Sequence, residues 1–161
     1  MLDFQIDKDV ILIDDKKRKI TINRRRKSVL KENKFSYYGR FAPLITTNEI
    51  ISLQYLEDME QVPSYRRRIS SNSFEMSLLE AKRLSRDNFI GCEKLEELFI
   101  QINSRGVYDF DLNDKDILVF EGEYRILDFG ASLRIPQKSF KRAYDKFILN
   151  PKLERLEKRF S

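Results

Sequence analysis

The chain has 161 residues, enough for one domain or for two small lobes that share an interface. Its 31 lysines and arginines exceed its 26 acidic residues, and the net charge of +5 suits an anionic partner such as a nucleotide. With no histidine and one cysteine, the sequence excludes Ser-His-Asp and Cys-His catalysis, His-ligated metal sites and an internal disulfide. Oxygen ligands remain for any metal, which favours Mg²⁺ or Mn²⁺.

The first third of the chain predicts short antiparallel strands. Val10–Ile13 is apolar, Lys19–Asn23 alternates with a period of two, and a third strand starts at Ser28. A polar turn separates each strand from the next. We therefore expect a meander of three strands.

A helix and a hairpin follow the meander. Thr46–Glu49 fits a capping box, so we predict that the helix begins there. Apolar residues then recur at helical spacing: Ile50, Leu53, Leu56 and Met59. Tyr65–Ile69 and Phe74–Leu79 predict a hairpin joined by a serine-rich turn. Residues 1–80 thus predict five antiparallel strands and one helix.

Residues 81–161 predict a mainly helical second part, and the whole chain belongs to the α+β class. The expected elements are a helix over about Glu93–Ser104 that Gly106 ends, strands at Asp116–Glu121 and Tyr124–Asp128, and helices at about Lys138–Ile148 and Lys152–Phe160, the last begun by Asn150 and Pro151.

Three acidic residues stand beside the predicted strands of the second part. Asp111 lies five residues before Asp116, and Asp128 follows twelve residues later. Because the last two lie at the open end of one hairpin, their carboxylates can face a common phosphate group. Phosphoryl transfer requires such a group to orient the attacking hydroxyl, and oxygen ligands to hold Mg²⁺. The alternative is a polar turn followed by an ordinary hairpin.

Asp111-Leu-Asn-Asp-Lys-Asp116 and Asp128-Phe-Gly130 resemble the catalytic loop and the Asp-Phe-Gly loop of the protein-kinase-like superfamily. By this resemblance, Asp111 orients the acceptor hydroxyl and Lys115 neutralises the transferred phosphate. Asp116 and Asp128 then hold Mg²⁺.

The resemblance extends to the first part of the chain. Lys31 matches the strand lysine that contacts the α- and β-phosphates, and Glu49 matches its partner on the following helix. Glu49 also has the simpler interpretation of a helix cap. The segment containing Glu75, Ser77 and Leu78 resembles the strand and hinge that run along the adenine.

Over about residues 28–135, the chain is similar to small bacterial kinase-like proteins related to lipopolysaccharide core kinases and RIO-type atypical kinases. This resemblance implies a protein-kinase-like two-lobed fold, with an N-lobe over residues 1–80 and a truncated C-lobe over 81–161. It implies ATP and Mg²⁺ or Mn²⁺ as ligands, and phosphorylation of a hydroxyl on a lipid-linked glycan or a protein. We expect a cytoplasmic protein, peripheral at an anionic inner-membrane surface.

Several residues depart from the family pattern. Asp109 stands where a histidine is usual, and Asp116 replaces the usual asparagine. No glycine-rich loop is present, so basic side chains of the turn at residues 14–19 are candidates to replace it. These departures keep open a pseudokinase that acts as a scaffold or regulator without catalysis.

Two basic runs, Arg24–Lys27 and Arg66–Arg68, leave a third interpretation. They predict either solvated turns or a binding surface for an anionic membrane or nucleic acid. Few aromatic residues lie between these basic residues, which disfavours a single-strand nucleic-acid binder.

Overall fold

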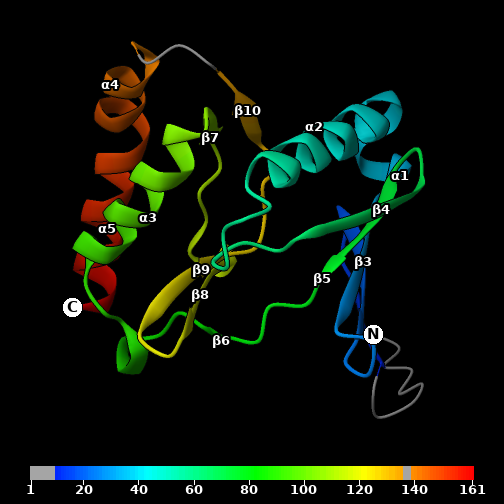
Figure 1. The fold of residues 1–161 in the computed structure, drawn as a ribbon, viewed down its shortest axis with the longest axis horizontal. Helices are drawn as coiled ribbons and strands as arrows, with labels where there is room; N and C mark the ends of the chain where they lie inside the picture. The colour runs from blue at the N-terminus through cyan, green and yellow to red at the C-terminus, as the bar shows by residue number, and fades with distance from the viewer. Residues whose placement is uncertain (1–9, 136–138) are drawn as a thin grey trace.

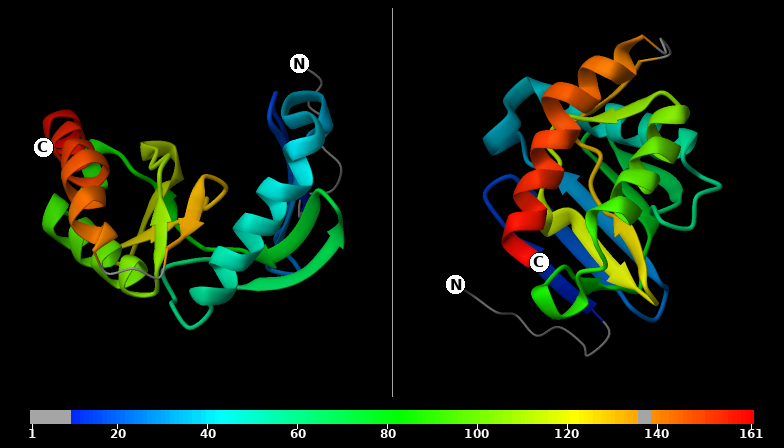
Figure 2. Two further views of the ribbon diagram at one scale, coloured as in Figure 1. Left: turned by 90° about the horizontal axis from the view of Figure 1, so that it is seen from above. Right: turned by 90° about the vertical axis from the view of Figure 1, so that its left-hand side faces the viewer.

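The computed structural model describes residues 10–135 and 139–161, and its strands and helices confirm the predicted α+β class (Figure 1). Lys138, where the sequence predicts the start of a helix, lies outside the described residues. Two groups of elements are visible in Figure 2, a sheet with one long helix and a mainly helical C-terminal part.

Five antiparallel strands form the N-terminal sheet, in the order β1-β2-β3-β5-β4. Their bounds are β1 Val10–Asp14, β2 Arg18–Asn23, β3 Ser28–Asn33, β4 Tyr65–Ser70 and β5 Ser73–Ser77. The predicted meander and hairpin are both present. Because side chains alternate along a strand, Val29, Lys31 and Asn33 of the central strand β3 point to one face, and all three are buried.

The helix α2 (Ala42–Tyr55) begins four residues earlier than the sequence predicts, so the predicted capping box at Thr46 is wrong. Pro43 lies in the first turn, where a missing N–H costs nothing. Thr46 is inside the helix, and its hydroxyl donates to the carbonyl of Ala42 at 3.0 Å. Glu49 therefore lies in the middle of α2, where its carboxylate is not needed as a cap.

Two short turns of helix that the sequence does not predict precede α2: α1 (Phe35–Tyr38) and η1 (Gly39–Phe41). Leu56 and Met59, predicted to continue the helix, follow its end and are buried in the loop. These two residues are apolar because they are buried, not because they belong to the helix. Their spacing in the sequence does not distinguish the two cases.

The second part contains the predicted helix and hairpin. The helix α3 (Cys92–Ser104) ends as predicted before Gly106, whose φ of +77° is left-handed. The predicted strands are β8 (Ile117–Phe120) and β9 (Glu123–Ile126). Three shorter strands and two single turns were not predicted: β6 Lys82–Arg83, β7 Val107–Asp109, β10 Ser132–Arg134, η2 Arg86–Asn88 and η3 Asp114–Asp116.

The C-terminal helices run into each other. The elements α4 (Phe140–Tyr144), η4 (Asp145–Leu149) and α5 (Asn150–Phe160) follow without a break, so the predicted cap at Asn150 is wrong. The segment η4 is π-helical. This wider turn lies just before Pro151, whose ring would otherwise clash with the carbonyl one turn back.

A single cluster of buried apolar side chains extends through both parts of the molecule. It includes Leu53 from α2, Phe74 from β5, Phe99 from α3 and Tyr144 from α4, all at most 1% exposed. The two parts are thus held together by shared burial. Among the residues described, no helix combines the length and apolar character that crossing a bilayer requires.

Candidate active site

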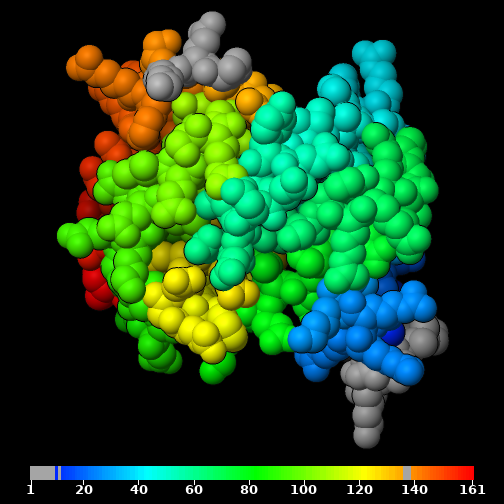
Figure 3. Space-filling model, viewed as in Figure 1, coloured from blue at the N-terminus to red at the C-terminus, as the bar shows by residue number. Residues whose placement is uncertain are grey.

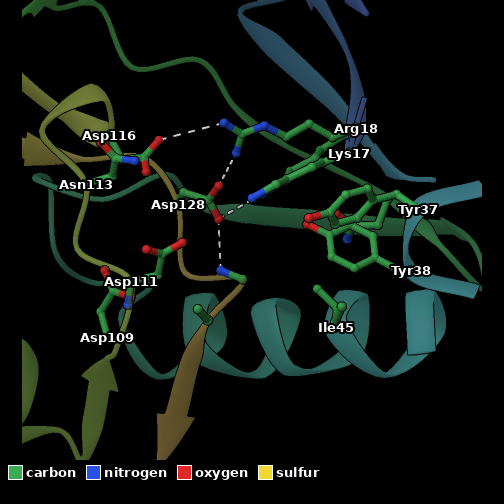
Figure 4. A pocket seen from close by; sticks show the side chains of 14 residues that line it. Lys17, Arg18, Tyr37, Tyr38, Ile45, Asp109, Asp111, Asn113, Asp116 and Asp128 are labelled. Carbon is green, nitrogen blue, oxygen red and sulfur yellow. Dashed lines mark hydrogen bonds and ion pairs between the residues drawn. The ribbon is translucent and has the colours of Figure 1, made fainter. Parts of the chain in front are cut away.

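The two parts of the molecule meet at a cleft with a volume of about 300 Å³ (Figure 4). Strands β2 and β3 and the turn α1 contribute one wall, and the loops on either side of the β8–β9 hairpin contribute the other. Its lining includes Lys17, Arg18, Lys31, Tyr37, Tyr38, Asp109, Asp111, Asn113, Asp116 and Asp128.

Backbone bonds at the base of the hairpin bring the acidic loops together. Ile117 pairs with Ile126, and the N–H of Leu127 donates to the carbonyl of Asp116 at 3.0 Å. A second bond, from the N–H of Phe110 to the carbonyl of Ala131, joins the loops on their other side at 3.2 Å. The chain reversal that the sequence predicts is therefore present, and Asp111, Asp116 and Asp128 line one cleft.

Asp128 is positioned by the two residues that follow it. Phe129 is fully buried, so its backbone is fixed while the Asp128 side chain points into the cleft. The N–H of Gly130 donates to Asp128 Oδ1 at 2.8 Å. A Cβ atom at position 130 would lie 3.2 Å from that oxygen, so glycine allows this close approach.

Lys31 and Glu49 form a buried ion pair. Lys31 Nζ donates to Glu49 Oε1 at 2.6 Å and to Asp128 Oδ1 at 2.9 Å. Lys31 is 3% exposed and Glu49 is completely buried. The structure thus joins three of the predicted site residues through one ammonium group.

The charged groups in this cluster change one another's pKa values. Burial disfavours the ammonium, but the carboxylates of Asp128 and Glu49 outweigh it and hold the pKa of Lys31 above its ordinary value. Burial also disfavours the Asp128 carboxylate, but Lys31 and Arg18 hold its pKa well below its usual range. Asp128 is therefore ionised at neutral pH, as a cation ligand must be.

The pKa values of Asp116 and Asp109 are raised, in contrast to that of Asp128. Burial, with the negative charge of Asp128 adding to it, raises the pKa of Asp116 to about 6. Burial likewise raises the pKa of Asp109 to about 7, although the N–H of Asp111 donates to its Oδ1 at 3.0 Å. Asp109 is thus a buried carboxyl that holds the Asp111 backbone.

We expect Asp109→Asn to stabilise the protein at high pH, because asparagine keeps the acceptor oxygen without the buried charge. The pKa of Asp109 is about 7 in the folded state and 3.8 in the reference state. Between these two pH values, the folded protein keeps a proton on Asp109 that the unfolded chain has lost. The stability that this proton contributes in wild type is fully present below about pH 4 and is lost as pH rises through 7. The variant should gain about 2–4 kcal/mol over wild type at pH 8 and much less at pH 5, measured by urea unfolding. An equal gain at both pH values would contradict the prediction.

Besides Glu49, which is completely buried next to Lys31, four predicted site residues do not line the cleft. Lys115 is exposed, and its N–H donates to Asn113 Oδ1. Glu75 pairs with Arg67 at 2.8 Å. Ser77 and Leu78 use their backbone N–H groups to donate to other backbone carbonyls. Their roles at phosphate and adenine stay predictions.

Arg18 is the main cleft residue that the sequence interpretation does not single out. It follows the β1–β2 turn, and its guanidinium bonds to Asp128 and lies 3.9 Å from Asp116 Oδ1. The absence of a glycine-rich loop points to this basic turn but not to one residue of it. Tyr37 and Tyr38, stacked edge to face, were also missed because they lie on an unpredicted turn.

The two basic runs come together away from the cleft. Arg66 donates to the backbone carbonyls of Arg26 and Lys27 at 3.3 and 3.0 Å. Figure 3 shows the β2–β3 turn, in blue, beside the green β4–β5 hairpin. Binding of an anionic membrane or nucleic acid there stays a prediction.

Two solved structures are similar to this chain: the Rio2 kinase from Chaetomium thermophilum, with a TM-score of 0.72 and 18% identity, and its ADP/Mg²⁺–phosphoaspartate complex, with a TM-score of 0.69 and 19% identity. Each match covers 94% of this chain. The chain has the protein-kinase-like fold. It spans 57% and 56% of the length of those two chains. No protein-family model and no curated protein sequence matches it.

The carboxylates at the cleft fit a divalent cation. The Arg18 guanidinium bonds to Asp128 with one nitrogen and lies 3.9 Å from Asp116 Oδ1 with the other, so both acidic side chains face the same part of the cleft. Mg²⁺ commonly binds one or two carboxylates and completes its coordination with phosphates and water. Within residues 10–135 and 139–161, no set of three or more acidic or cysteine side chains is placed to hold a metal by itself.

Proposed function

We propose that this protein is an ATP-dependent phosphotransferase that phosphorylates a hydroxyl group. The main support is the Glu49–Lys31–Asp128 chain of contacts at a cleft that Asp111 and Asp116 also line. This constellation requires residues from β3, α2 and two separate loops, so local sequence alone does not produce it. A kinase-like fold around the same cleft adds to this support.

Each side chain would contribute position or charge, which is most of what phosphoryl transfer requires. Lys31, held by Glu49, would bind phosphate oxygens of ATP. Asp111 would orient the acceptor hydroxyl and accept its proton. Asp116 and Asp128 would hold Mg²⁺, which when bound offsets the negative charge on the phosphates. The Rio2 complex contains ADP and Mg²⁺, which supports proposing the same ligands here.

For the acceptor, we propose a hydroxyl on a lipid-linked glycan, with a protein hydroxyl as the alternative. The glycan assignment rests on the sequence resemblance to lipopolysaccharide core kinases. The protein alternative is supported by the structural likeness to a Rio2 kinase.

A scaffold without catalysis is the second candidate function. The observation that favours it is the Arg18 guanidinium, which lies where the proposed metal would bind. A protein that keeps this arrangement would bind nucleotide without metal, or not at all.

Thermal unfolding with a non-hydrolysable ATP analogue separates the two candidates. A phosphotransferase should gain about 2.7 kcal/mol when the ligand is present at 100 times its dissociation constant, a rise of about 5–10 °C in Tm. We expect this rise with Mg²⁺ or Mn²⁺ and a smaller one with EDTA. An equal rise in Tm with metal and with EDTA would contradict the metal site. No rise in Tm under either condition would favour the scaffold.

A further inference from the structure

Both carboxylate oxygens of Asp128 already have partners. Oδ1 accepts from Lys31 Nζ at 2.9 Å and from the N–H of Gly130 at 2.8 Å. Oδ2 accepts from Arg18 Nη1, and Arg18 Nη2 lies 3.9 Å from Asp116 Oδ1. Figure 4 shows this guanidinium extending from β2 between the two acidic side chains. A metal ion that binds Asp128 Oδ2 and Asp116 would lie beside the Arg18 guanidinium, so the two cations compete for these oxygens.

The two cationic partners of Asp128 differ in how firmly they are held. The side chain of Lys31 is 4% exposed and has Glu49 as a second partner. The side chain of Arg18 is 28% exposed and lies at the first residue of β2, just after the turn. Its third acidic neighbour, Asp15, belongs to that same turn, and the Asp15 side chain is 46% exposed. Arg18 is therefore the partner that can move into solvent or toward a ligand.

We propose that Arg18 determines the order in which metal and nucleotide bind, an inference that rests on the proposed function. In the nucleotide-free protein, its guanidinium takes the place of the divalent cation between Asp116 and Asp128. Phosphate oxygens of the entering nucleotide then bind the guanidinium and draw it away. The metal binds to the carboxylates that this movement releases.

The charge balance of the cleft explains the coupling. Among the described residues, the lining holds four acidic side chains (Asp109, Asp111, Asp116 and Asp128) and three basic ones (Lys17, Arg18 and Lys31). A guanidinium and a divalent cation repel each other at the same pair of carboxylates. Arginine also matches phosphate oxygens in a bidentate geometry, so a nucleotide offers it a second binding partner. Metal and nucleotide therefore favour each other's binding through one side chain.

Calorimetric titration of the full chain with MnCl₂ and with ADP, separately and together, tests this role. In Arg18→Gln, we expect Mn²⁺ alone to bind about tenfold more tightly than in wild type, because its competitor is gone. We expect ADP without metal to bind about tenfold more weakly, because a phosphate partner is lost. If Arg18→Gln does not fold by circular dichroism, Arg18→Lys serves instead. Lysine keeps the positive charge but lacks the second nitrogen that faces Asp116. The Arg18→Lys variant should therefore still bind Mn²⁺ more tightly than wild type.

Lys19→Gln is the matched control, because it removes the same charge from the next residue of β2, which is exposed. Its affinities should stay within about twofold of wild type, which excludes a general effect of net charge. Equal Mn²⁺ affinity in wild type and Arg18→Gln would overturn the role of Arg18, while Mn²⁺ binding to wild type with ADP would leave the proposed function intact. No Mn²⁺ binding under any condition would overturn both.

Discussion

Asp128→Asn should reduce phosphoryl transfer from ATP by at least about 100-fold, the loss typical of removing one group that stabilises a charged transition state. Asparagine has nearly the shape of aspartate, and it can still accept hydrogen bonds from Lys31 and Gly130. It lacks the negative charge that Lys31 and Arg18 stabilise in wild type. The measurement is transfer of labelled phosphate to a glycolipid extract and to a protein mixture.

Asp58→Asn is the control for that comparison. Asp58 pairs with Arg105 on the surface, its side chain is 67% exposed, and it does not line the cleft. Its variant should transfer phosphate at the wild-type rate. If the Asp128 variant were equally active, Asp128 would have no part in catalysis and the proposed function would lose its main support.

The sequence predicts those parts of the site that depend on chain reversal at short range. The β8–β9 hairpin connects Asp116 to Asp128 within twelve residues, so the spacing of the acids is enough to place them together. The N-terminal sheet is likewise readable from alternation and turn residues. Each of these features depends on local patterns that tertiary contacts leave unchanged.

The sequence does not predict which basic side chain enters the cleft or where α2 begins. Lys16, Lys17, Arg18 and Lys19 are equivalent as a basic turn, but Lys17 and Arg18 line the cleft whereas Lys19 is exposed to solvent. At α2, the capping-box pattern competes with Pro43, and the earlier start prevails. Within this helix, Glu49 lies opposite Lys31. Both outcomes depend on how the sheet packs against the rest of the chain.

Lys31→Met should destabilise the protein by about 3–5 kcal/mol, because it leaves the completely buried Glu49 without its cationic partner. In wild type, Glu49 Oε2 already has no hydrogen-bond partner among the described residues, so Oε1 and its bond to Lys31 carry the compensation. Methionine preserves the length of the side chain and isolates the charge. The expected fall in Tm is about 10 °C for a chain of this size.

The pH dependence of the Lys31→Met variant identifies the buried charge as the cause. Burial raises the pKa of Glu49 to about 7 even with Lys31 present, so losing Lys31 should raise it further. A raised folded pKa means that protonation favours the folded state, so the deficit relative to wild type should be larger at pH 8 than at pH 5.5. Lys31→Met with Glu49→Gln should recover part of the loss at pH 8, since position 49 then carries no buried charge. Lys19→Met is the control, because Lys19 is an exposed strand residue. It should change the free energy of unfolding by no more than about 0.5 kcal/mol. A Lys31→Met variant as stable as that control would mean that the ion pair does not compensate the buried charge of Glu49.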